Sequence, residues 1–236
     1  NFIEEPSGKN TAPAIGLAAL HIYNKDPKGV MAIYPADHLI KGTKLFIETI
    51  RSAESLVQEQ DALVTIGINP TYAATGYGYI QCSQENGLVE KNIYKVKSFA
   101  EKPNKNKAEK FVKSGEFLWN SGIFIWKAAK ILSEMKIHMH DLHSSLNIIS
   151  DSIGTPQYEI ILNAEWKNII PESIDYGILE KAQNVYTVRA DFEWSDLGTW
   201  DSLFKAFEKN EEDDREYIVA MNSIEGALPN SSDDGS

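Results

Sequence analysis

The sequence predicts an α/β domain in which helices pack against a largely parallel or mixed β-sheet. Segments with helical spacing of apolar residues alternate with short strand-like segments through most of the 236 residues, an order typical of layered α/β proteins. The composition, 42% apolar and 24% charged, is sufficient for one domain with a substantial core.

In the first part of the chain, Asn10 or Thr11 can cap a helix that begins near Pro13. The wholly apolar segment 30–34 predicts a central strand covered on both faces. The loop that follows it, residues 35–38, then lies at the sheet edge where α/β proteins bind ligands. Further on, a helix is expected over 43–60, a strand over 62–68, a glycine-broken turn over 74–79 and a strand over 93–100.

The second part continues the alternation. A lysine-rich helix is expected over 105–114 and a buried strand within 118–126, followed by helices within 128–149, 156–168 and 174–183. A strand over 185–190, a loop over 194–198 and a helix over 198–209 complete the predicted domain, residues 1–209. Residues 210–236 form an acidic tail with strand character only at 217–221, and its last residues, 229–236, are too polar to pack and are expected to be disordered.

The formal charge of −11 argues against nucleic-acid and anionic-membrane partners. Residues 208–236 contain nine acidic and two basic residues, so this segment carries −7 and residues 1–207 carry only −4. Local basic groups in the body of the protein can therefore still bind an anion.

The chain contains one cysteine, Cys82, which excludes an intramolecular disulfide. Its place in an alternating segment favours a packed strand residue over a nucleophile. There is no apolar run long enough for a membrane span and no signal-like segment, and these features predict a cytoplasmic protein.

Two carboxylates, Asp37 and Asp196, each follow a predicted core strand and lie in a short loop. Carboxylates from two loops at one sheet edge could hold Mg²⁺, which leaves its other positions to water and phosphate oxygens. On spacing alone, a turn or helix-cap role is the simpler explanation for either aspartate.

Other motifs suit a phosphosugar. Lys102 could neutralise a phosphate and Glu101 could accept hydrogen bonds from sugar hydroxyls, although a solvated pair at a strand end is the simpler explanation. Asn120 could turn its amide toward a polyol or serve as a turn residue. Gly76 and Gly78 could let backbone approach a ligand, or only form a bend.

A histidine group and two tryptophans have weaker claims to function. His138, His140 and His143 are poorly spaced for one metal site on a helix and are expected on the surface. Trp194 and Trp200 could stack on a ligand, but core packing is the simpler use.

The order of the motifs is far more specific than any one of them. The chain closely resembles the mannose-1-phosphate guanylyltransferases, which are sugar nucleotidyltransferases, over residues 1 to about 207. The segments that carry the resemblance are 5–15 (EPSGKNTAPAI), 35–38 (PADH), 76–80 (GYGYI), 99–103 (FAEKP), 119–124 (WNSGIF), 173–176 (SIDY) and 194–200 (WSDLGTW).

The resemblance implies a Rossmann-like, mainly parallel sheet flanked by helices, of the nucleotide-diphospho-sugar transferase type. It also implies conversion of GTP and mannose 1-phosphate to GDP-mannose and pyrophosphate, with Mg²⁺ as cofactor. Self-association into a homo-oligomer is left open. The roles it implies are Mg²⁺ binding by Asp37 and Asp196, sugar-phosphate binding by Lys102, mannose binding by Glu101, Asn120, Asp175 and the Gly76 backbone, and nucleotide binding by Pro6, Gly8, Asn10 and Thr11.

The chain departs from this family at its start. The family's first strand and its glycine-rich loop with an arginine are absent, so an N-terminally truncated domain with little activity is expected. Two alternatives stay open: a transferase for another base or sugar, and a non-catalytic subunit that binds sugar nucleotides.

Overall fold

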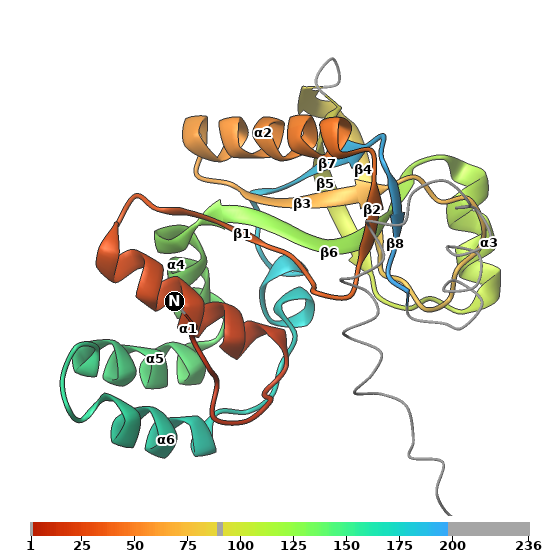
Figure 1. Ribbon diagram of the computed structural model, residues 1–236. Helices are drawn as coiled ribbons and strands as arrows, with labels where there is room; N and C mark the ends of the chain where they lie inside the picture. The colour runs from red at the N-terminus through yellow and green to blue at the C-terminus, as the bar shows by residue number, and fades with distance from the viewer. Residues whose placement is uncertain (1, 89–91, 198–236) are drawn as a thin grey trace, which may run out of the picture.

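A computed structural model describes residues 2–88 and 92–197 (Figure 1). The helices are α1 (Thr11–Lys25), α2 (Thr43–Glu59), α3 (Lys105–Ser114), α4 (Ala128–His138), α5 (His140–Ser152), α6 (Tyr158–Asn168) and the π-helix η2 (Asp175–Leu179). The strands are β1 (Val30–Ile33), β2 (Leu39–Lys41), β3 (Leu63–Ile68), β4 (Tyr79–Leu88), β5 (Ile93–Ala100), β6 (Phe117–Lys127), β7 (Val185–Ala190) and β8 (Glu193–Ser195). The expected helix 198–209 and tail 210–236 lie outside the described residues.

The main sheet has the strand order β1-β6-β3-β7-β5-β4, and β6 also pairs with β4. The prediction of a mixed sheet flanked by helices is confirmed, but the prediction that it is mainly parallel is wrong. Among the described strands only β3 and β7 pair in parallel, while β6 runs antiparallel to β1, β3 and β4. Alternation of helix and strand does not specify strand direction, and the short connection from β4 to β5 allows only antiparallel pairing.

The prediction that segment 30–34 is a central strand is also wrong for the described part of the chain. There β1 pairs with β6 alone, and only Met31 of its four residues is buried. Val30 and Ile33 are half-buried and pack against the two opposite cores of the sheet. The apolar character of segment 30–34 therefore correctly indicated packing against the cores on both faces of the sheet. It did not indicate how many strands pair with this segment.

Two cores cover the two faces of the sheet, and β6 contributes to both because its side chains alternate. Phe124 and Trp126 pack with α1, α4, α5, α6 and η2 on one face. Ile123 and Ile125 pack with α2 and α3 on the other. Figure 1 shows α2 on one side of the sheet and the group α1, α4, α5 and α6 on the opposite side.

A short ribbon, formed by the antiparallel strands β2 and β8, was not predicted, since residues 39–41 were assigned to no element and residues 194–198 were expected to form a loop. It pairs Leu39 with Ser195, Ile40 with Trp194 and Lys41 with Glu193. Three-residue strands carry too little periodicity to be read from sequence, and these two lie far apart in the chain. The ribbon joins the loop after β1 to the end of the described chain.

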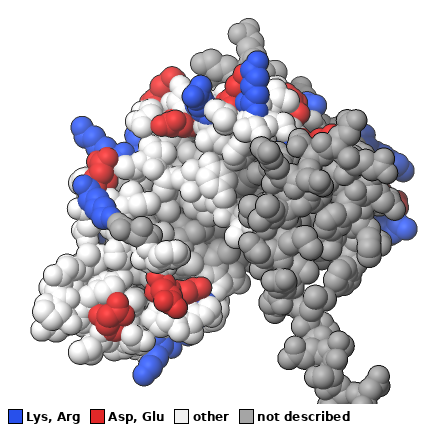
Figure 2. Space-filling view, in the orientation of Figure 1, with Lys and Arg blue, Asp and Glu red and all other residues white. Residues whose placement is uncertain are grey.

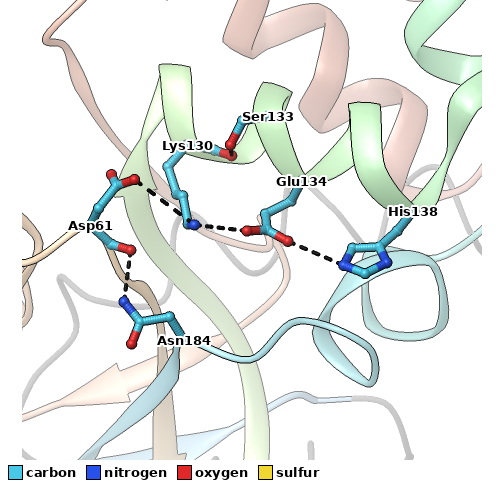
Figure 3. A network of polar contacts seen from close by, with 6 residues as sticks. All are labelled: Asp61, Lys130, Ser133, Glu134, His138 and Asn184. Carbon is cyan, nitrogen blue, oxygen red and sulfur yellow. Dashed lines mark hydrogen bonds and ion pairs between the residues drawn. The ribbon is translucent and has the colours of Figure 1, made fainter.

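A polar network anchors α4 to the sheet (Figure 3). Lys130 Nζ lies 2.7 Å from Glu134 Oε1 and 3.8 Å from Asp61 Oδ2, and His138 Nε2 lies 3.2 Å from Glu134 Oε2. Asn184 donates to the Asp61 carbonyl oxygen. Because Asp61 and Asn184 precede β3 and β7, the network holds α4 beside the starts of the two parallel strands.

The described surface carries both signs of charge. In Figure 2, Lys and Arg side chains are interspersed with Asp and Glu around a white, uncharged area left of the centre of the view. Among the described helices, none combines the length and the apolar character that crossing a bilayer requires.

Leu146 on α5 is fully buried in the helical core, whereas Ile148 on the same helix is 49% exposed. Leu146→Ala removes methyl groups from a packed site and is expected to lower the free energy of unfolding by about 2–5 kcal/mol. Ile148→Ala, the matched control, is expected to change it by less than about 0.5 kcal/mol. Urea denaturation followed by circular dichroism measures both, and equal losses would contradict the assigned core.

Candidate active site

The two predicted metal ligands lie at the same end of the β2–β8 ribbon. Asp37 precedes β2 and Asp196 directly follows β8, and the pairing of Leu39 with Ser195 brings these ends together. Asp37 and Asp196 both favour the charged form of His38, whose pKa is nevertheless lowered because burial outweighs them. His38 is thus within electrostatic reach of both carboxylates.

Several aromatic side chains surround this ribbon end. Trp194 donates its indole N–H to His38 Nδ1 at 3.1 Å, with the two rings edge to face. The Tyr77 hydroxyl donates to Asp196 Oδ1 at 2.9 Å. Burial, followed by hydrogen bonding to Tyr72 and Asp196, raises the pKa of Tyr77, so this hydroxyl stays protonated at neutral pH.

Asn120, on β6, is the centre of the second group of predicted residues. Its Nδ2 donates to Asp175 Oδ1 at 2.7 Å. Its Oδ1 accepts from the Thr65 hydroxyl at 3.0 Å and from the Gly122 N–H at 3.3 Å. Its backbone N–H donates to the Gly78 carbonyl at 2.8 Å. With both ends of the amide engaged, its orientation is determined, which a simple turn residue would not require.

Glu101 lies against Gly78, where a Cβ atom would stand 2.5 Å from Glu101 Oε2. Any side chain at Gly78 would therefore displace the carboxylate. Gly76, which was expected to offer its backbone to the sugar, has open space around the position of a Cβ atom. Lys102 Nζ pairs with Glu101 Oε1 at 3.5 Å but remains 65% exposed, and its backbone is left-handed at φ 44°.

The half-buried Asp175 carboxyl has a pKa raised to about 6, chiefly because of burial and then because of the nearby Glu101 charge. The hydrogen bond from Asn120 acts in the opposite direction. The pKa of Glu180 is also raised, by burial and by Glu101. Glu101, Asp175 and Glu180 thus form an acidic group, with Lys102 as an ion-pair partner of Glu101, and it offers acceptors for the hydroxyls of a polyol.

Residues 6–11, the segment predicted to bind the nucleotide, are largely exposed. This segment is hydrogen-bonded to Ile174, the residue that precedes Asp175. Asn10 caps α1 by accepting from the Thr11 N–H, which confirms a predicted cap, and Thr11 Oγ1 accepts from the Ile174 N–H at 2.8 Å. Close to Gly8, Trp166 donates to the Ser7 carbonyl at 2.7 Å. Pro6 lines a pocket of about 530 Å³ with His21 and Tyr158.

Sequence reasoning missed Thr65, Tyr77 and Glu180 as members of the site. Tyr77 and Trp194 belong to motifs that were singled out, but the partners of their polar atoms depend on tertiary structure. Thr65 lies inside an apolar strand and Glu180 follows η2, and neither position carries a signal in the sequence.

The remaining candidates have structural roles. His138 ends α4 and pairs with Glu134, whereas His140 begins α5, so the three histidines are divided between two helices. Burial raises the pKa of the Cys82 thiol to about 11, which favours the packed strand residue over a nucleophile. No group of three or more His, Cys, Asp or Glu residues within 2–88 and 92–197 could hold a metal by itself.

The fold is that of a layered α/β protein, with helices on both faces of a mixed sheet. The nucleotidyl transferase family model matches residues 1–213, and the chain belongs to this family. It is 36% identical over 219 residues to the mannose-1-phosphate guanylyltransferase of Escherichia coli, covering 89% of this chain and 46% of that protein. The chain thus spans less than half the length of that relative.

Two solved structures share the fold. A structure described as mannose-1-phosphate geranyltransferase from Thermus thermophilus has 27% identity and a TM-score of 0.77, covering 89% of this chain and 59% of that one. A structure described as mannose-6-phosphate isomerase from Helicobacter pylori has 31% identity and a TM-score of 0.68, covering 81% of this chain and 73% of that one.

The raised pKa of Asp175 makes its ionisation unfavourable for the folded state. Its contribution to stability is therefore full below about pH 4 and is lost as the pH rises through about 6. Asp175→Asn retains an acceptor for Asn120 and is expected to raise the free energy of unfolding at pH 7.5 by about 1–2 kcal/mol, with little gain at pH 4.

Urea denaturation at the two pH values measures this difference. Asp151→Asn, at an exposed position on α5, is the control for loss of one negative charge. A D175N gain that is equal at both pH values, or matched by D151N, would show that ionisation of Asp175 does not carry the effect.

Proposed function

We propose that this chain forms the nucleotidyl-transferring part of a mannose-1-phosphate guanylyltransferase, which joins GTP and mannose 1-phosphate to give GDP-mannose and pyrophosphate. One observation carries the proposal: Asn120, Asp175 and Glu101 lie together beside Gly78. The residue before Gly78, Tyr77, donates its hydroxyl to Asp196. The family membership and the mannose phosphates named for the relatives support the same substrate class.

The donor set at the ribbon end fits Mg²⁺. Asp37 and Asp196 provide two carboxylates, and Mg²⁺ typically takes one or two from a protein, with water and phosphate oxygens as its other ligands. When bound there, Mg²⁺ supplies positive charge that neutralises phosphate oxygens. The aromatic surroundings of Asp196 support this role, because they orient one of its oxygens through Tyr77.

The main task of the protein residues is to orient the sugar phosphate and the nucleotide and to lower the repulsion between these two anions. We assign Asn120 and Glu101 to the sugar hydroxyls, since Asn120 is held rigidly and Glu101 is an acceptor beside it. Lys102 is exposed and lies next to Glu101, so its ammonium group can reach the phosphate of a sugar held there. Asp175 orients Asn120, and the Gly76 backbone is assigned to the same sugar.

The reaction then needs no protein nucleophile. A phosphate oxygen of mannose 1-phosphate attacks the α-phosphorus of GTP in line, the bond from α-phosphorus to the bridging oxygen breaks, and pyrophosphate leaves with the electron pair. The segment with Pro6, Gly8, Asn10 and Thr11 is assigned to the nucleotide. The hydrogen bond from Ile174 to Thr11 would place this segment next to Asp175, which orients the sugar-binding Asn120.

Pyrophosphate release tests the reaction class. The purified chain is expected to turn over slowly, because it lacks the glycine-rich loop of the family it resembles, and to release more pyrophosphate from GTP with mannose 1-phosphate and Mg²⁺ than from UTP with glucose 1-phosphate. Release that is higher with UTP and glucose 1-phosphate would assign another sugar nucleotide. Binding of GDP-mannose by a longer version that includes a glycine-rich loop, without release from any substrate pair, would favour a non-catalytic subunit.

Lys102→Ala should weaken sugar-phosphate use by removing the charge that meets the phosphate. We expect the KM for mannose 1-phosphate to rise about ten- to hundred-fold, with a smaller change for GTP, since a hydrogen bond to a charged group contributes roughly 1.5–3 kcal/mol. Lys113→Ala, on α3, is the matched control for loss of one lysine. Unchanged KM and kcat in K102A would contradict the assignment.

A further inference from the structure

Tyr77 and its neighbour Gly78 contact both halves of the candidate site. The Tyr77 hydroxyl donates to Asp196 Oδ1 at 2.9 Å. The Gly78 carbonyl accepts from the Asn120 N–H at 2.8 Å, and Gly78 itself lies against Glu101. Two consecutive residues therefore join the carboxylate assigned to the metal with the residues assigned to the sugar.

Aromatic packing fixes the position of the Tyr77 ring. Its centroid lies 5.0 Å from that of Trp119 and 5.4 Å from that of Trp194, both edge to face. Trp119 is only 4% exposed, and Trp194 is itself held by its hydrogen bond to His38. A ring held between β6 and β8 fixes the position of the hydroxyl oxygen, which also hydrogen-bonds with Tyr72, and keeps it within donating distance of Asp196.

We propose that Tyr77 is a positioning residue, whose hydroxyl holds the Asp196 carboxylate in the orientation that binds the divalent cation. The proposal rests on the proposed function, because that function assigns Asp196 to the metal. Mg²⁺ requires near-ideal octahedral geometry, so rotation of one carboxylate weakens its binding. Groups that orient metal ligands typically contribute ten- to hundred-fold to metal affinity.

The test is Mn²⁺ binding to the full 236-residue chain without nucleotide, measured by electron paramagnetic resonance of the free ion. Tyr77→Phe keeps the packed ring and loses only the hydroxyl, and it is expected to weaken Mn²⁺ binding about ten- to hundred-fold. Tyr158→Phe, which loses a hydroxyl 2.7 Å from His21 Nε2 on the helical side, is the matched control and should bind Mn²⁺ like the unmodified chain. Equal affinity of Y77F and the unmodified chain would overturn the proposal.

The double variant shows whether Tyr77 acts through Asp196. Y77F/D196N is expected to bind Mn²⁺ no more weakly than D196N alone, because the hydroxyl then has no carboxylate to orient. A further loss in the double variant would overturn the proposal and leave the metal assignment intact. If D196N binds Mn²⁺ as tightly as the unmodified chain, the metal assignment itself fails, and Tyr77 loses this role with it.

Discussion

The rest of the site depends on the hydrogen bonds made by Asn120. Through its side chain and its backbone N–H it holds a buried hydroxyl on β3, the carboxyl at the start of η2 and the carbonyl that precedes β4. These groups come from distant parts of the chain. Without an amide at this place, the Asp175 carboxyl would lose its side-chain donor and Thr65 its acceptor.

The sheet makes this amide effective because β6 is shared by so many neighbours. It pairs with β1, β3 and β4, and its alternating side chains enter both hydrophobic cores. A residue on such a strand moves little, which suits a group that must orient a ligand. The short ribbon of β2 and β8 pairs outside the main sheet, and hydrogen bonds from Tyr77 to Asp196 and from Trp194 to His38 tie its end to neighbouring residues.

Electrostatic strain accompanies this arrangement. Asp175 is half-buried close to Glu101, and both burial and the neighbouring charge raise its pKa. A carboxyl kept under these conditions costs stability, and such costs are commonly found at functional sites. The polar network of α4 differs, since Lys130 and Glu134 satisfy each other and join secondary structure together.

Local periodicity and residue type were enough to predict most of the helices and strands in their order, the cap of α1, and the motifs around Asp37, Lys102, Asn120 and Asp196. Only the tertiary structure decided strand direction, the edge position of β1 among the described strands, the β2–β8 ribbon and the partners of Tyr77. Those features depend on pairing between residues far apart in the chain, where packing and hydrogen-bond geometry, and not local pattern, select one arrangement.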